Sequence, residues 1–247
     1  MIDIQATELF LTGVFTGFVD SIAGGGGLIS LPVLTVLLGP GAQAIGTNKV
    51  AGSVAASVAL LVYWRAGYLD FKKSFVFAFW IACGAFLGSR LSPHLPLPAF
   101  RWILVGTCPL VLGAVLRKNA WVRPLTVTQV ATGPRLLVAG ILCGVYDGAW
   151  GPGAGTFMLL ALFFLARLPL LTALAASKLA NSCSALVALG SYAIQGYVHW
   201  KEGLFLSFGV LFGAFIGAHS ATYSAERLVR PVLVVVVGLL MARLIQG

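Results

Sequence analysis

Long apolar runs, separated by short polar breaks, recur along the whole chain. Runs of this length and composition are typical of transmembrane helices, and the connections between them leave no room for a soluble domain. The pattern therefore predicts one all-α integral membrane domain over residues 1–247. The predicted segments are 8–23, 28–38, 43–64, 73–91 and 100–116 in the first half, and 135–150, 156–166, 170–194, 204–219 and 227–245 in the second.

The two halves are related by an internal duplication. The stretch GFVDSIAGGGG, from Gly17, aligns with GVYDGAWGPGA, 127 residues later, and this pairs Asp20 with Asp147. NKVAGS aligns with SKLANS, 129 residues later, and this pairs Lys49 with Lys178. The same shift places GAFLG (84–88) on GAFIG (213–217). We therefore expect two homologous helical repeats, at about 1–116 and 135–247, joined by the polar linker 117–134.

Segments 28–38 and 156–166 are too short to cross about 30 Å of hydrocarbon at about 1.5 Å per residue, so we expect them to be half-helices. If each is a separate pass, a repeat has five elements and the second repeat is inverted. If each forms one pass with the segment before it, a repeat has four elements and the two are parallel. The positive-inside rule favours inversion, because basic residues crowd only one of two equivalent loops. The two loops carry Arg65, Lys72 and Lys73, and Lys201 with Glu202.

The composition agrees with a membrane protein and constrains its partners. Hydrophobic residues make up 59% of the chain and charged residues 9%, whereas about a quarter of an ordinary soluble domain is charged. The net charge of +9 comes from basic residues at the ends of apolar runs, where they set topology and meet anionic lipid headgroups. We expect the lipid bilayer as a partner and no nucleic acid, and we leave a homodimer open.

Glycine-rich stretches interrupt the apolar pattern at equivalent places, beside Asp20 and beside Asp147. In hydrocarbon, irregular backbone is tolerated only where it is buried in protein or lines a polar cavity. Duplicated transporters build substrate sites from such broken helices, whose amino-terminal amides point at an anion. The alternative is that these glycines only permit close helix packing. The glycines predicted to bind substrate are Gly24, Gly25, Gly26, Gly27, Gly151 and Gly153.

Lys49 and Lys178 lie inside predicted helices, each with a serine four residues later on the same face. An ammonium at such a depth costs about 2.5 to 3.5 kcal/mol on insertion scales, so both lysines need a polar partner. They either form structural ion pairs with Asp20 and Asp147 or bind a substrate anion, and the two roles are compatible. The polar residues predicted to bind substrate are Asn48, Lys49, Ser53, Lys178, Asn181 and Ser182.

Asp20 and Asp147 are candidates for ion pairing or for proton coupling, because a carboxylate in a low-dielectric site favours its protonated form. We expect no metal and no cofactor, because the cysteines and histidines have no ligand-like spacing. These residues are Cys83, Cys108, Cys143 and Cys183, and His94, His199 and His219.

The sequence GGGGLISLPVL, followed by a helix that begins AIGTNK, is repeated at half-length. It resembles the TauE/SafE family of probable sulfite and organosulfonate exporters over nearly the entire chain. The resemblance implies a multi-pass protein that moves small sulfur-containing anions across a bacterial cytoplasmic membrane. The second repeat has Pro152 and Ala154 where the first has Gly25 and Gly27, so the two halves need not bind equivalently.

A monoanion leaving a negative-inside cell gains about 2.3 kcal/mol per 100 mV, so export needs no coupling ion. We therefore predict a secondary transporter or uniporter that exports a small anion by alternating access, and not an enzyme. A proton-coupled anion importer is one alternative. A membrane-embedded enzyme acting on a lipid phosphate is another, although no histidine or arginine cluster lies near the glycines. Two lysines at the same depth argue against a cation transporter.

Overall fold

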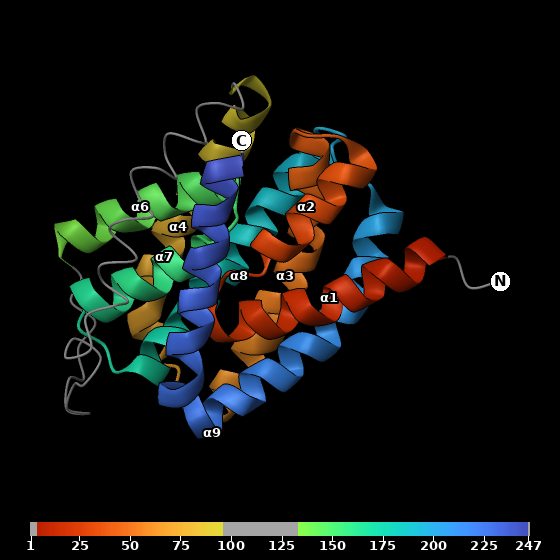
Figure 1. Cartoon of the computed structure of the whole chain (residues 1–247). Coiled ribbons are helices and arrows are strands. Elements are labelled where there is room, and N and C mark those ends of the chain that lie inside the picture. The colour runs from red at the N-terminus through yellow and green to blue at the C-terminus, as the bar shows by residue number, and fades with distance from the viewer. Residues whose placement is uncertain (1–3, 96–132, 247) are drawn as a thin grey trace.

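The computed structural model describes residues 4–95 and 133–246, so the predicted segment 100–116 and nearly all of the linker lie outside the described residues. Within these ranges every regular element is helical, which confirms the all-α prediction (Figure 1). The first half contains α1 (Ile4–Ala23), α2 (Gly27–Leu38), α3 (Ala42–Arg65), α4 (Phe71–Leu91) and a 3₁₀ turn (Ser92–His94). The second contains α6 (Pro134–Ala149), α7 (Ala154–Leu160) with a π-helical turn (Ala161–Leu165), α8 (Leu170–Ile194) and α9 (Trp200–Gln246).

Five of these helices are long and apolar enough to cross a membrane. Helix α2 has only 12 residues and thus spans about 18 Å at 1.5 Å per residue, well short of the hydrocarbon thickness. The stretch Ala154–Leu165 is equally short. The five membrane-length spans are Ala6–Ala23, Ala42–Arg65, Ser74–His94, Leu170–Ile194 and Trp200–Ala225.

Helix α9 contains a sharp bend where the sequence predicts the boundary between segments 204–219 and 227–245. Ser224 has φ −143° and ψ 38°, values far from those of an α-helix. The chain therefore forms two helical stretches that meet at this residue. Figure 1 shows the first stretch running beside α1 and the second turning away from it. The two predicted segments are therefore present, although their helices meet without a loop.

The largest helix contacts join the first half of the chain to the second. Helix α1 packs along α9, α4 packs along α6, and α3 and α8 pack on each other and are the most buried of the spans. A Cβ atom on Gly17 of α1 would overlap the carbonyl oxygen of Val210 in α9, and one on Gly88 of α4 would overlap that of Val145 in α6. Small residues thus let the backbones approach closely, as is usual between helices in membranes.

Candidate functional site

Helices α1 and α6 both end inside the protein, at aligned positions. Gly24, the residue after α1, has a φ of 78°. Gly151, two residues after the end of α6, has a φ of 99°. Glycine adopts this backbone conformation without the steric cost that a Cβ atom brings. The chain then restarts as α2 in the first half and as α7 in the second. A break therefore occurs at the glycine-rich stretch of each half, as the glycine-rich pattern predicts.

The two breaks touch each other. A Cβ atom on Gly24 would overlap the backbone of Gly155, and one on Gly155 would lie 2.7 Å from the Cα atom of Gly24. Neither position has room for a side chain. The glycines are therefore required by the close approach of two backbone segments that lie more than half a chain apart.

The carbonyl groups at the end of α6 have no partners within the helix and need partners from elsewhere, because little water is present at this depth. Side chains supply them. Lys49 donates to the carbonyl of Asp147, Tyr192 donates to that of Gly148 at 2.8 Å, and Ser92 donates to that of Ala149 at 2.7 Å.

The end of α1 is capped in the same way. Lys178 donates to the carbonyl of Asp20, Tyr63 to that of Ser21 at 2.9 Å, and Thr156 to that of Ala23 at 2.7 Å. The tyrosine bonds occupy aligned positions in the two halves, and each lysine caps a helix of the opposite half. A cation at the carboxyl end of a helix is also favoured by the helix dipole.

Each lysine also forms an ion pair with the aspartate whose carbonyl it caps. Lys49 Nζ lies 2.8 Å from Asp147 Oδ1, and Lys178 Nζ lies 3.3 Å from Asp20 Oδ2. All four side chains are at most 10% exposed. The sequence left ion pairing and anion binding as compatible alternatives for the two lysines. The structure contains the ion pairs, and each pair joins a lysine of one half to an aspartate of the other half.

The two ion pairs have different surroundings. The second carboxylate oxygen of Asp147 accepts a hydrogen bond from the Ser184 hydroxyl, whereas Asp20 accepts one from the backbone N–H of Gly26 at 3.2 Å. Ala55 occupies the position in the first half that aligns with Ser184. The halves are thus equivalent in their backbone breaks but not in their polar side chains.

A small polar cavity of about 30 Å³ lies between the two breaks and the helices α3 and α8. It has room for about two water molecules. The predicted site residues that line it are Asp20, Gly24, Gly27, Asn48, Lys49, Asp147, Gly151 and Asn181.

The remaining predicted residues have other surroundings. Gly26 bonds to Asp20, and Gly153 has φ 77° immediately before α7. Ser53 donates to the carbonyl of Val50 in its own helix at 2.8 Å. The predicted site residues that lie outside the cavity lining are Gly25, Gly26, Ser53, Gly153, Lys178 and Ser182.

A family model described as "Sulfite exporter TauE/SafE" matches residues 9–244. The chain belongs to the TauE/SafE family. Its relatives include "Probable membrane transporter protein ORF9" of a Sinorhizobium species, 33% identical over 92% of this chain and 87% of the relative. A "Probable membrane transporter protein" of Haemophilus influenzae is 30% identical over 99% of this chain and 95% of the relative. "Probable membrane transporter protein YfcA" of Escherichia coli is also 30% identical, over 96% and 88%.

No solved structure matches this TauE/SafE protein. The family description and the names of the relatives indicate a membrane transporter and not an enzyme. The five membrane-length helices agree with that assignment.

Some cavity-lining residues of this TauE/SafE protein were not predicted as site residues. Gly52, Gly155 and Ala185 line the cavity, and their small size leaves the space open. Ser184, which bonds to Asp147, was also missed, although Ser184 and Asn181 lie three residues apart on α8 and so share a helical face. That spacing of polar residues in an apolar helix was a usable signal.

The chemistry that the cavity offers is that of ions and hydrogen bonds. It combines one ammonium group, two carboxylates, two side-chain amides and the glycine backbone. Within residues 4–95 and 133–246, no three histidine, cysteine or acidic side chains lie close enough together to hold a metal ion. Cys83, Cys143 and Cys183 are free thiols.

Proposed function

We propose that this protein is a secondary transporter or uniporter that exports small sulfur-containing anions, such as sulfite and short organosulfonates, from the bacterial cell by alternating access. The observation that carries the proposal is the position of Lys49, a buried residue whose side chain lines a small polar cavity between the two backbone breaks. The match to a family model named for sulfite export supports the choice of substrate class.

The donors around the cavity suit an anion. Gly27, the first residue of α2, lines the cavity, so the positive end of the helix dipole lies beside it. The Ser30 hydroxyl donates to Asn48 Oδ1 at 2.6 Å, and this bond occupies the amide oxygen. The amide nitrogen of Asn48 lies toward Gly27, where it can donate to a ligand. Asn181 supplies a second amide from the opposite helix.

The ion pair between Lys49 and Asp147 links binding to movement. An anion in the cavity competes with the Asp147 carboxylate for the Lys49 ammonium. Because Lys49 also caps the end of α6, a shift of its ammonium toward the anion loosens that helix end. Substrate binding thereby biases the position of α6 and of the break that follows it.

The cavity must enlarge during transport, because about 30 Å³ is too small for the four heavy atoms of sulfite. The glycine-lined contacts of α1 with α9 and of α4 with α6 are smooth enough for one helix to slide past the other. In the inverted arrangement that the sequence predicts, exchanging the conformations of the two repeats opens the site to the opposite side of the membrane.

Export in this proposal is uncoupled from protons. Asp20 and Asp147 each have a lysine ammonium within hydrogen-bond distance, so each carboxylate is held in an ion pair. The membrane potential alone drives a monoanion outward, by about 2.3 kcal/mol per 100 mV. Proton-coupled import is the competing direction, and it requires one of these carboxylates to leave its lysine.

The test is the charge movement in proteoliposomes after a rapid jump in sulfite and then in methanesulfonate, at two pH values. The proposal predicts a current that saturates with anion concentration and keeps its sign and size without a pH gradient. A current that appears only with a pH gradient favours the proton-coupled importer. No response to any sulfur anion overturns the substrate class.

A further inference from the structure

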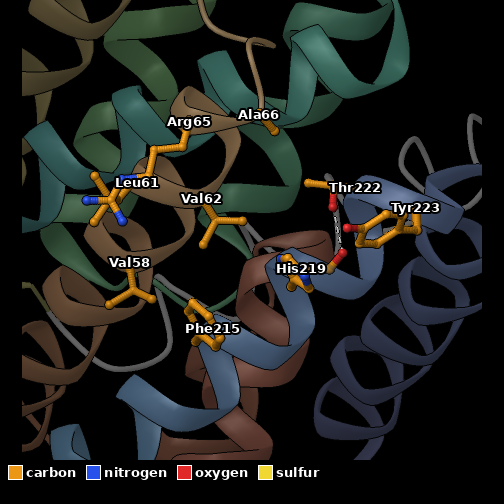
Figure 2. A pocket seen from close by; sticks show the side chains of 9 residues that line it. All are labelled: Val58, Leu61, Val62, Arg65, Ala66, Phe215, His219, Thr222 and Tyr223. Carbon is orange, nitrogen blue, oxygen red and sulfur yellow. Dashed lines mark hydrogen bonds between the residues drawn. The ribbon is translucent and has the colours of Figure 1, made fainter.

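A groove of about 420 Å³ lies on the outer surface between α3 and α9 and shares no lining residue with the central cavity (Figure 2). Val58, Leu61 and Val62 of α3 line one side, and Phe215 of α9 lines the other. Leu61 is 40% exposed and Phe215 55% exposed, so this apolar surface faces outward into the region that lipid occupies. A groove of this kind accommodates a hydrocarbon chain.

The groove lies where two membrane spans end together. The apolar spans of α3 and α9 end at Arg65 and Ala225, so this end of the groove is at the level of the lipid headgroups. Tyr223, which is 78% exposed and borders the groove, is a residue type that favours this level. A lipid chain lying along Val58 and Val62 therefore places its phosphate near Arg65.

Arg65 supplies the charge that an anionic headgroup needs. Its side chain is exposed, and among the described residues it makes no hydrogen bond and no ion pair. Lys72 and Lys73 lie in the first turn of α4, at the same end of the bundle as Arg65, and by the positive-inside rule these basic residues place this end at the cytoplasmic face. The cytoplasmic leaflet is the one whose negative surface potential such basic residues meet.

The aligned groove in the other half provides an internal control. It lies between α4 and α8 and has about 430 Å³, with Val187 and Phe86 at the positions that align with Val58 and Phe215. The position that aligns with Arg65 is Ile194. The nearby guanidinium of Arg90 stacks over the Phe86 ring, 5.3 Å from its centre.

We propose that the groove between α3 and α9 binds an anionic phospholipid of the cytoplasmic leaflet. One acyl chain lies along Val58, Leu61, Val62 and Phe215, and the phosphate contacts Arg65. The proposal is independent of the transported substrate. It follows from an exposed arginine at the headgroup end of an open apolar groove.

The test compares the full-length protein with Arg65→Gln and with the matched control Arg90→Gln, in micelles containing phosphatidylglycerol or phosphatidylcholine. Native mass spectrometry measures bound lipid. We expect wild type and Arg90→Gln to prefer phosphatidylglycerol and Arg65→Gln to bind it about fivefold more weakly. Equal binding of the two lipids by wild type, or equal loss in both variants, overturns the proposal.

A second measurement asks whether the groove between α3 and α9 is filled by a second copy of the chain and not by lipid. Val62→Cys, in a background with the native cysteines replaced, is treated with a short thiol cross-linker in phosphatidylglycerol vesicles. The proposal predicts a monomeric product, because lipid fills the groove. Efficient cross-linking between copies assigns the groove to a protein interface and overturns it.

Discussion

The ammonium of Lys49 lies 2.8 Å from Oδ1 of Asp147, which is 98 positions later in the chain and on the opposite half. The aligned lysine, Lys178, pairs with Asp20 in the same crossed manner. The two charged pairs therefore join the halves at the point where both backbones are broken. They also satisfy helix-end carbonyls that the membrane interior leaves without water.

Removing one member of a crossed pair should destabilise the protein strongly. Lys49→Met leaves the buried Asp147 carboxylate without its cation, which costs about 3 to 5 kcal/mol. Adding Asp147→Asn removes the stranded charge and should restore most of the loss. Thermal unfolding in detergent, followed by intrinsic fluorescence, measures both variants. Equal melting temperatures for the single and double variants would show that the pair is not stabilised as an ion pair.

Asn181 and its neighbour Ser182 should differ in their effect on transport. Asn181 lines the cavity, whereas the Ser182 hydroxyl lies 2.8 Å from that of Ser57, away from it. Losing a hydrogen bond to a charged ligand weakens binding on the order of 10- to 100-fold, so Asn181→Ala should raise the KM for sulfite by that factor. Ser182→Ala should leave the KM within about twofold. The reverse order of effects would move the site away from the cavity.

Gly155→Ala should disrupt the contact between the breaks. Its Cβ atom would lie 2.7 Å from the Cα atom of Gly24, and overpacking of this kind costs about 1 to 3 kcal/mol. The matched control is Gly190→Ala on α8, where an added Cβ atom meets nothing within 4 Å. We expect a lower melting temperature for the first variant and an unchanged or higher one for the second. Equal melting temperatures for Gly155→Ala and Gly190→Ala would contradict the close contact between Gly155 and Gly24.

The helices could be predicted closely because the apolar runs and the polar or glycine-rich breaks between them are local features of the sequence. The segment 170–194 coincides with α8, and the others differ by a few residues at most where they are described. The bend at Ser224 was predicted only as a gap between two segments, because nothing in the local sequence marks a turn without a loop.

The partners within the site could be predicted only in part. The sequence identified both lysines and both aspartates, but it gave no basis for pairing Lys49 with Asp147 and not with Asp20, because that choice depends on how the halves pack. The sequence also placed Lys49 and Lys178 in the same list of substrate-binding candidates, although Pro152 and Ala154 indicated that the halves need not bind equivalently. The structure places Lys49 on the cavity wall and Lys178 outside its lining, since side-chain surroundings differ even where the backbone repeats.

The most direct test of the central cavity is the sulfite-driven current of two charge-neutralised variants in proteoliposomes at symmetric pH. The first variant is Lys49→Met with Asp147→Asn, and the second is Lys178→Met with Asp20→Asn. Each removes one buried ion pair and the lysine cap of one helix end, so the second serves as the structural control for the first. We expect the first variant to raise the KM for sulfite on the order of 10- to 100-fold and the second to change it far less. Equal currents from the two variants, at matched amounts of folded protein, would contradict the assignment of the anion site to Lys49.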